Sequence, residues 1–347
     1  MSTRMTQSAS APPRVVAVTG AAGYIGGRLV ERLLAEGVER VLGVDVRPAN
    51  IQHERYTHLT QDICAPLDVA FRQHGVEAVV HLAFVLRQTR RRAEGRRVNV
   101  DGGNNVLWAA HAAGVRRMVL MSSATLYGPS SEHAEPLNEN SPVRPPKGFA
   151  YAEDKAETER AFRRYADTRG DEVDVSVLRG CVVMGPNAAN FITAALDKPV
   201  LVRVGREDPG LQFVHEDDVV ELLWRFVGAP HPGVFNVGAP GTVGWREVVA
   251  AAGKRLISLP AWVIYPLTQL AWWAHLQSDA PAVGLDFIRW PWVVSAAKLE
   301  AELGFTYAHD SRAALESYLA TQGRGAALRT TDEQDTGEAT EPEEESA

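Results

Sequence analysis

Cysteine is scarce in this chain of 347 residues, which contains only two, Cys64 and Cys181. Their spacing is not that of a metal site, and a chain of this length with two cysteines needs no disulfide framework. We therefore expect no bound metal and a cytoplasmic location, where thiols stay reduced. Residues 1–13 lack the apolar segment of a secretory signal, and we expect them to form a disordered N-terminal tail.

An excess of basic residues is also missing. The net charge is −7, and eight acidic side chains lie in the segment 330–347, which has no Lys or Arg. The rest of the chain is close to neutral, so nothing in the charge balance indicates nucleic acid. The acidic segment lacks large apolar residues as well, and we expect 322–347 to be an acidic disordered tail.

A glycine-rich stretch, TGAAGYIG at 19–26, lies between a short apolar β-branched run and apolar residues spaced as one face of a helix. A turn from strand to helix points backbone N–H groups and the positive end of the helix dipole at a ligand, typically a pyrophosphate. Gly20 permits the turn, Gly23 admits the ligand, and Gly26 allows close packing of helix on strand. Asp45 ends the next apolar strand, where a carboxylate is expected to accept a hydrogen bond from a ribose 2′-hydroxyl.

Strand-like and helix-like segments alternate from residue 15 to residue 123, including a long helix expected at about 92–113. This alternation predicts an α/β fold with a doubly wound parallel sheet of the Rossmann type. We expect a dinucleotide-binding domain over 14–179, to which some later segments return, and a smaller mixed substrate-binding lobe over 180–321. Ligands bind such sheets beyond the carboxyl ends of the strands. The residues at those ends, which we expect to share one cleft, are Gly20, Asp45, Asp62, Ala83 and Ser123.

Tyr151 and Lys155 are four residues apart in a segment of helical character, so they lie side by side on one helix face. An ammonium near a phenol favours the phenolate, and we expect it to lower the pKa of Tyr151 from the ordinary value of about 10. Such a phenol can act as the general base for an alcohol or the general acid for a ketone.

The motifs together resemble the extended short-chain dehydrogenase/reductase family, the NAD-dependent epimerase/dehydratase group, from Val15 to about Tyr318. The stretches that carry this resemblance are TGAAGYIG at 19–26, Asp62-Ile63, His81-Leu82-Ala83, Asn99-Val100, SSATLYG at 122–128, Tyr151 with Lys155, Leu178-Arg179, Phe213 to Val219 and Phe235 to Gly238.

The resemblance implies an enzyme that transfers a hydride between NAD and a secondary alcohol or ketone. Its implied catalytic residues are Ser123, which orients the substrate oxygen, Tyr151, which exchanges the proton, and Lys155, which binds the nicotinamide ribose. Asp45 favours NAD over NADP, although Arg47 could accept a phosphate. The implied cofactor-binding residues are Gly20, Gly23, Tyr24, Ile25, Gly26, Asp45, Arg47, Asp62, Ile63, Leu82, Ala83, Asn99, Tyr151 and Lys155. By analogy with the family, we expect a homodimer packed through the helix of Tyr151 and the preceding long helix.

The family default for the substrate is a nucleotide sugar, but two departures weaken it. Cys181 follows the Leu178-Arg179 pair where an Asn is usual, and Gln212 stands where these enzymes carry an Asp. A dehydrogenase or reductase of a more apolar substrate, of the hydroxysteroid or flavanonol kind, is the alternative. Ala124-Thr125 replaces the Asp-Glu pair of the dehydratases, and an NAD-sensing regulatory module would usually lose Tyr151 or Lys155. A buried inert thiol is the favoured interpretation of Cys181.

Two further stretches have no settled role. Six arginines lie between Arg87 and Arg97, where they form a solvated face or bind an anionic substrate. The segment from Leu256 to Ser278 has no Asp, Glu, Lys or Arg. We expect a hydrophobic cap over the substrate pocket or a packing face, with core packing favoured for its tryptophans. A membrane span and a peripheral membrane contact are less favoured, because Pro260 and Pro266 interrupt the segment.

Overall fold

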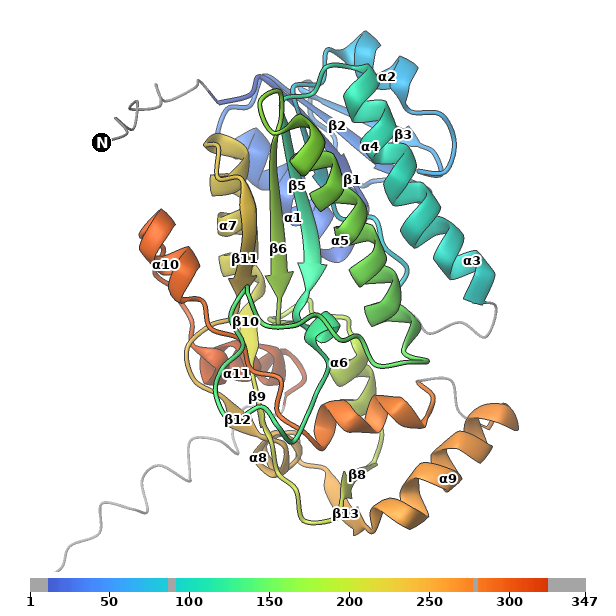
Figure 1. The fold of residues 1–347 in the computed structure, drawn as a ribbon. Coiled ribbons are helices and arrows are strands. Elements are labelled where there is room, and N and C mark those ends of the chain that lie inside the picture. Colours follow the sequence, from blue (N-terminus) through green and yellow to red (C-terminus); the bar gives the residue numbers. More distant parts are fainter. Residues whose placement is uncertain (1–11, 87–91, 277–279, 324–347) are drawn as a thin grey trace, which may run out of the picture.

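The computed structural model describes residues 12–86, 92–276 and 280–323. These residues form a seven-stranded sheet in the order β11-β6-β5-β4-β1-β2-β3 (Figure 1). Every neighbouring pair in this sheet is parallel, which confirms the predicted Rossmann-type α/β fold. Its strands are β1 (Val15–Thr19), β2 (Arg40–Asp45), β3 (Tyr56–Thr60), β4 (Ala78–His81), β5 (Arg117–Ser123), β6 (Asp174–Gly180) and β11 (Gly233–Val237).

Helices cover both faces of the sheet, which explains why β1 is apolar without alternation. Val16 and Val18 face the layer of α1 (Tyr24–Ala35) and α7 (Glu216–Gly228). Val15 and Ala17 face the opposite layer. That layer contains α2 (Asp68–His74), α4 (Gly103–Ala112) and α5 (Ala150–Arg169). On the first side, α10 (Ala297–Leu303) contacts β11.

The long helix expected at 92–113 is present but is not uniform. It consists of α3 (Arg92–Arg96), a π-helical segment η1 (Arg97–Gly102) and then α4. A Cβ atom on Gly102 would lie 2.7 Å from Ile63 Cδ1, so the helix passes very close to the segment after β3. π-Helical turns are rare and often occur near functional sites. This one contains Asn99, one of the residues predicted to bind the cofactor.

The remaining elements gather beyond the carboxyl end of the sheet (Figure 1). They include three two-stranded pairs, β7 (Val182–Met184) with β10 (Phe213–His215), β9 (Gly210–Leu211) with β12 (Val243–Gly244), and β8 (Val200–Val204) with β13 (Arg255–Leu259). The helices here are α6 (Phe191–Leu196), α8 (Trp245–Ala251), α9 (Ala261–Trp273), η3 (Ala282–Ile288) and α11 (Ser311–Thr321). This mixed lobe therefore lies over the edge of the sheet at which the strands end.

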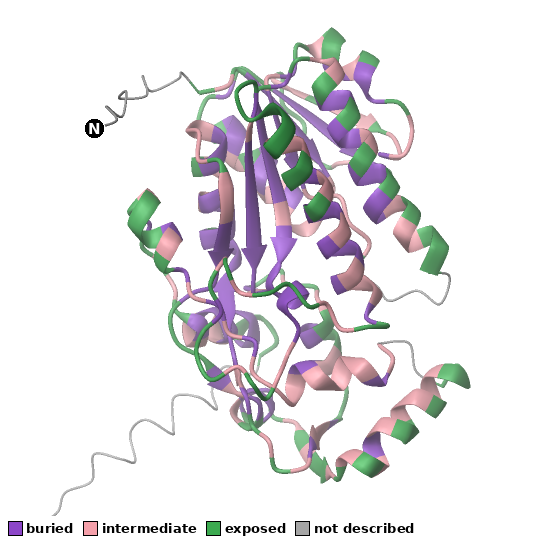
Figure 2. Cartoon of the chain, in the orientation of Figure 1, coloured by how far each residue is buried: buried purple, intermediate pink, exposed green. Residues whose placement is uncertain are grey.

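The apolar segment after Leu256 does not pack as expected. In α9 only Ile264 is buried, and most of the helix is exposed or half-buried (Figure 2). Trp262 and Trp273 are exposed, whereas Trp292, further along the chain, is a core residue. The prediction of a packing face or cap is therefore wrong for the outer face of α9.

A buried ion pair fastens α5 to the sheet. The Nε atom of Arg179, on β6, lies 3.1 Å from both carboxylate oxygens of Glu159, on α5. Ser122 of β5 donates to the same carboxylate at 2.7 Å. Arg179 also donates to the Tyr127 hydroxyl at 2.7 Å, which donates to Asn236 Oδ1 at 2.8 Å. The network joins α5, three strand ends and the short helix η2 (Ala124–Tyr127).

We expect Arg179→Ala to lower the free energy of unfolding by about 3–5 kcal/mol, because Glu159 would be left as a buried charge without its partner. Arg163 provides the matched control, since its guanidinium lies 3.8 Å from the same carboxylate but is exposed. Arg163→Ala should change the free energy of unfolding by less than about 1 kcal/mol. Denaturant unfolding followed by circular dichroism measures both, and equal effects would contradict the role assigned to the buried pair.

Candidate active site

The glycine turn between β1 and α1 has no room for side chains. Gly20 has a φ of +76°, and a Cβ atom there would lie 2.8 Å from the backbone nitrogen of Ala83. A Cβ atom on Gly26 would overlap with the carbonyl oxygen of Gly20. The glycines at these positions therefore let the turn close against both the helix and the end of β4.

The first turn of α1 is suited to an anion. Its N-cap, Gly23, provides no side-chain cap for the helix, so the first backbone N–H groups are available to a ligand. A diphosphate would satisfy them and the helix dipole together. The Tyr24 side chain points elsewhere, because its hydroxyl donates to the buried carboxylate of Glu216 on α7. Only the backbone of Tyr24 is therefore free to face a cofactor.

Asp45, at the end of β2, has its carboxylate fixed beside this turn. Its Oδ2 accepts from the backbone nitrogen of Ala22 at 3.1 Å, and its Oδ1 accepts from that of Arg47 at 3.0 Å. The Arg47 guanidinium is largely exposed and lies 3.4 Å from Asp45. A fixed carboxylate favours ribose hydroxyls over a phosphate, so the residues present fit NAD.

Asp62 and Ile63, which are predicted to bind the cofactor, already form hydrogen bonds within the chain. Asp62 accepts from the backbone nitrogen of Cys64 at 2.9 Å and from Arg97 at 2.7 Å. The backbone hydrogen bond and Arg97 lower the pKa of this carboxyl group. The Ile63 side chain is buried in the core, and its carbonyl accepts from Asn105 at 2.6 Å. Ile63 can therefore meet a cofactor only through its backbone N–H.

The described part of the arginine cluster forms ion pairs. Arg97 pairs with Asp62, Arg96 lies 2.6 Å from Glu157, and Arg92 lies 2.5 Å from Glu153. Two of these partners belong to α5, so the pairs hold α3 against that helix. The other three arginines, Arg87, Arg90 and Arg91, lie outside the described residues.

The loop after β4 is held by Thr19 and Asn99. Leu82 donates from its backbone nitrogen to the Thr19 carbonyl at 3.1 Å, and Ala83 donates to Thr19 Oγ1 at 3.3 Å. The amide of Asn99 accepts from the backbone nitrogen of Val85 at 2.7 Å and donates to Asp154 at 3.1 Å. Asn99 thus connects this loop to α5, and its role toward the cofactor stays a prediction.

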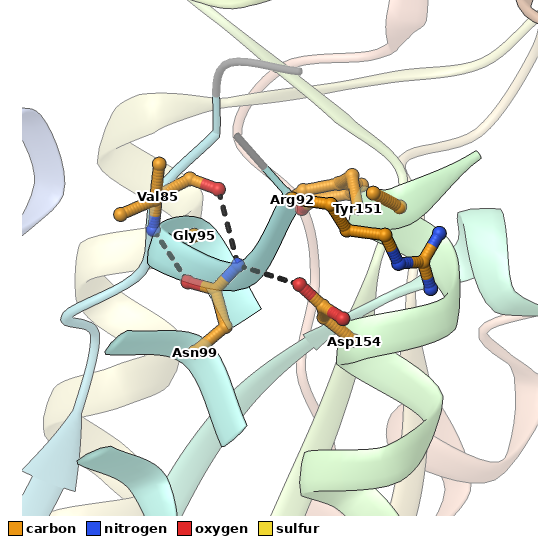
Figure 3. Close-up of a pocket in the computed structure, with 7 residues that line it drawn as sticks. Val85, Arg92, Gly95, Asn99, Tyr151 and Asp154 are labelled. Carbon is orange, nitrogen blue, oxygen red and sulfur yellow. Dashed lines mark hydrogen bonds between the residues drawn. The ribbon is translucent and has the colours of Figure 1, made fainter. Parts of the chain in front are cut away.

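These contacts border a pocket beside Tyr151 (Figure 3). Figure 3 shows the Asn99 amide between Val85 and Asp154. Asp154 is 2% exposed, and burial raises the pKa of its carboxyl group. The residues that line the pocket are Val85, Arg92, Gly95, Asn99, Ala150, Tyr151 and Asp154.

Ser123, at the end of β5, is aligned by a neighbour. Its Oγ accepts from the backbone nitrogen of Thr125 at 3.2 Å and from the Thr125 hydroxyl at 2.9 Å. Both acceptor positions of the hydroxyl are then in use, so its own hydrogen is left for donation. The Ser123 hydroxyl lies close enough to the half-buried Tyr151 phenol to lower its pKa, which brings the predicted Ser and Tyr pair together.

Lys155 is buried next to this pair. Its Nζ donates to the carbonyl of Met121 at 2.6 Å. The same atom lies 3.8 Å from the centre of the Phe84 ring and 5.9 Å from that of Tyr151. The rings of Phe84 and Tyr151 meet edge to face, with their centres 5.5 Å apart. Phe84 therefore packs against both members of the Tyr and Lys pair.

The pKa values correct one expectation. Burial raises the pKa of Tyr151, while the hydrogen bond with Ser123 acts in the opposite direction. The expected lowering by Lys155 is therefore wrong for this structure. Burial instead lowers the pKa of Lys155 to about 7, with Glu159 opposing the shift. The phenol is protonated at neutral pH, and the ammonium is close to its titration point.

Three residues of this site were missed by reasoning from the sequence. Glu159 lies four residues after Lys155, and that helical spacing was a signal for it. Thr125 is part of the SSATLYG segment, and Phe84 directly follows His81-Leu82-Ala83, but neither pattern indicates their contacts. Cys181 is buried, and burial raises the pKa of its thiol, as expected for an inert cysteine. Within the described residues no group of three or more His, Cys, Asp or Glu side chains could hold a metal.

Several known proteins are similar to this chain in sequence or in structure. The uncharacterized protein Rv0501 of Mycobacterium tuberculosis is 27% identical over 322 residues, which cover 90% of this chain and 85% of that protein. UDP-glucuronic acid decarboxylase 4 of Arabidopsis thaliana is 29% identical over 246 residues, which cover 65% of this chain and 54% of that protein. The solved structure of MoeE5 in complex with UDP-glucuronic acid and NAD has a TM-score of 0.70 at 26% identity. It covers 89% of this chain and 99% of MoeE5.

A family model fits the part of the chain that contains this site. The model of the NAD dependent epimerase/dehydratase family matches residues 16–238. The match includes the glycine turn, Asp45, Ser123, Tyr151 and Lys155. It confirms the predicted enzyme class and NAD as the cofactor, in agreement with the NAD-containing MoeE5 complex. The chain therefore belongs to the NAD-dependent epimerase/dehydratase family of the extended short-chain dehydrogenase/reductase type.

Proposed function

We propose that the chain oxidises or reduces a secondary alcohol or ketone of a nucleotide sugar, with Ser123, Tyr151 and Lys155 as its catalytic residues. The observation that carries the proposal is the contact of Tyr151 with Ser123 beside the buried Lys155. These side chains lie at the edge of the sheet that also holds the glycine turn. A single extended dinucleotide can reach from that turn to the phenol.

NAD, when bound, accepts or returns the hydride at the carbinol carbon. In the substrate complex the Ser123 hydroxyl turns its one hydrogen from Tyr151 to the substrate oxygen and holds that oxygen against Tyr151. The Tyr151 phenol donates a proton when a ketone is reduced, and the phenolate accepts one when an alcohol is oxidised. The Lys155 ammonium donates one N–H group to the Met121 carbonyl. Its other two N–H groups suit the hydroxyls of the nicotinamide ribose. The same charge stabilises the phenolate.

The nucleotide-sugar class is supported by the relatives. MoeE5 was solved with UDP-glucuronic acid, and the Arabidopsis relative is named for the same sugar nucleotide.

Gln212 stands where nucleotide-sugar enzymes carry an Asp, and its side-chain amide is hydrogen-bonded inside the protein. It donates to the carbonyls of Ala239 and Val294 and accepts from the backbone nitrogen of Val294, each at 3.0 Å.

A more apolar substrate is the second candidate, because aromatic rings surround the phenol. Phe84 and Phe149 both meet the Tyr151 ring edge to face, with centres 5.5 and 6.4 Å apart. Phe287 packs on Phe149 at 4.7 Å. Native mass spectrometry of the purified chain would separate the two classes, since a co-purified nucleotide sugar supports the first and an apolar ligand the second.

We expect Tyr151→Phe to reduce turnover about 10²–10⁴-fold, because the variant has no proton to exchange. NAD affinity, measured by calorimetry, should stay within about threefold, since less than 1 kcal/mol of binding energy is removed. Turnover is measured with UDP-glucose and UDP-glucuronic acid. The matched control is Tyr165→Phe on the same helix, which should leave turnover unchanged. If both variants retain full activity, Tyr151 is not the proton donor.

The glycine turn offers a second matched pair. Gly26→Ala places a methyl group against the Gly20 carbonyl, whereas the nearest atom to a methyl group on Gly27 is 3.6 Å away. We expect Gly26→Ala to weaken NAD binding about tenfold or more and Gly27→Ala to change it less than about twofold. Calorimetry on folded protein, checked by circular dichroism, measures both. Equal affinities would show that NAD does not depend on this turn.

Burial of Lys155 has a consequence for stability. Its pKa is about 7 in the folded chain and about 10.5 in the unfolded one. Between these values the unfolded chain binds more protons, so this group makes the free energy of unfolding rise with pH. We expect the unmodified chain to gain stability relative to Lys155→Met between pH 7 and pH 9.5, as measured by denaturant unfolding.

If the stability difference between the unmodified chain and Lys155→Met stays constant over this pH range, the burial of a titrating ammonium at Lys155 is contradicted.

A further inference from the structure

The outward face of α9 is apolar along its whole length. Successive residues of this face are spaced at helical intervals and comprise Trp262, Pro266, Leu267, Leu270 and Trp273. Trp262 is 80% exposed, Trp273 is 67% exposed, and Leu276, just after the helix, is 81% exposed. A surface helix normally turns its polar face outward, so α9 has the reverse arrangement.

The polar groups of α9 point into the protein instead. The Tyr265 hydroxyl donates to Asp286 on η3, and the Gln269 side chain accepts from the backbone nitrogen of Ala282 at 3.2 Å. The single buried side chain of the helix, Ile264, lies on this inner side. These contacts fix which face of α9 is turned outward. The packing of α9 on η3 therefore leaves the tryptophans exposed.

The place and size of α9 define what can cover it. It lies at the end of the lobe farthest from the parallel sheet and stands away from the body (Figure 1), and its surface is exposed or half-buried (Figure 2). A helix of 13 residues is about 20 Å long, which is shorter than the hydrocarbon core of a bilayer, about 30 Å. No described helix is long and apolar enough to span a membrane.

Two cations lie near the start of this helix. Arg203 is in register with Ser258 on β13, and Gly205 donates to the Leu259 carbonyl at 2.7 Å, which places Arg206 near the start of α9. Lys254 and Arg255 lie at the opposite end of the same strand pair, where β13 begins. None of these four side chains forms a salt bridge with a residue that the structure describes.

Carboxylates are fewer at this end of the lobe. Glu207 is paired with Arg289 at 3.5 Å, and the carboxylates here without a salt bridge to a described residue are Asp197, Asp208 and Asp286, the last of which accepts from the Tyr265 hydroxyl. The four unpaired cations therefore outnumber the unpaired carboxylates. An apolar helix with tryptophans at both ends and cations at its base is suited to a layer that has an apolar interior and an anionic surface.

We propose that α9 docks on an anionic lipid membrane, lying in the plane of the interface with Trp262, Leu270 and Trp273 among the acyl chains. Arg203 and Arg206 then face the lipid headgroups, where each positive charge contributes to binding. A second copy of the chain fits less well, because two helices packed face to face would bring these like charges together. The proposal is independent of the substrate, since α9 contributes no catalytic side chain.

The test is flotation of the full chain with vesicles of phosphatidylcholine alone or with added phosphatidylglycerol. We expect binding to the anionic vesicles, with a blue shift of tryptophan fluorescence as the indoles leave water. Trp262→Ser with Leu270→Ser and Trp273→Ser should reduce the bound fraction about tenfold or more. Trp108→Ser is the control, because Trp108 is a similarly exposed tryptophan, 55% exposed, on α4.

A second variant tests how much the positive charges contribute to membrane binding. Arg203→Gln with Arg206→Gln should weaken binding to anionic vesicles, and added salt should weaken binding of the unmodified chain. Equal binding to both kinds of vesicle, or no binding to either, would overturn the proposal. So would undiminished binding of the triple variant. A dimer in sedimentation that dissociates on the triple substitution would show that a second copy covers α9 instead.

Discussion

The buried ion pair between Glu159 and Arg179 is the contact on which the site depends. It docks α5 on the central strands, and α5 carries both Tyr151 and Lys155. Because the pair is excluded from water, a shift of the helix would leave two buried charges without partners. The position of the phenol relative to the strand ends is therefore set by the core of the fold rather than by a surface loop.

The same burial determines the chemistry of the two side chains. A desolvated ammonium titrates near neutral pH and a desolvated phenol stays protonated, so burial reduces the charge of the resting pair. Thr125 fills both acceptor positions of the Ser123 hydroxyl, so before substrate binds the one Ser123 hydrogen can be donated to Tyr151, which favours the phenolate. Within the site, Ser123 and Lys155 are thus the groups that can shift the Tyr151 proton toward the substrate.

The sequence predicts the sheet, the glycine turn and the Ser–Tyr–Lys set because each depends on local spacing: apolar runs, glycines three residues apart, and a helical interval of four. It does not predict contacts made between distant elements. Packing between segments far apart in the chain decides three features of the site. These are the contact of the Phe84 ring with Lys155, the π-helical turn around Asn99 and the direction of the Tyr151 pKa shift. The outward face of α9 was also mispredicted, since apolar composition alone does not say whether a helix meets the core or another surface.

The central claim is that the glycine turn and the Tyr151 phenol act on the two ends of one NAD molecule. A crystal structure of the chain with NAD tests it most directly. The account predicts the diphosphate over Gly20 to Gly26, the nicotinamide ribose on Lys155, and the nicotinamide ring beside Tyr151 and Ser123. A dinucleotide bound with its nicotinamide outside the cavity of Tyr151 and Ser123, or with its diphosphate away from the turn, would contradict it.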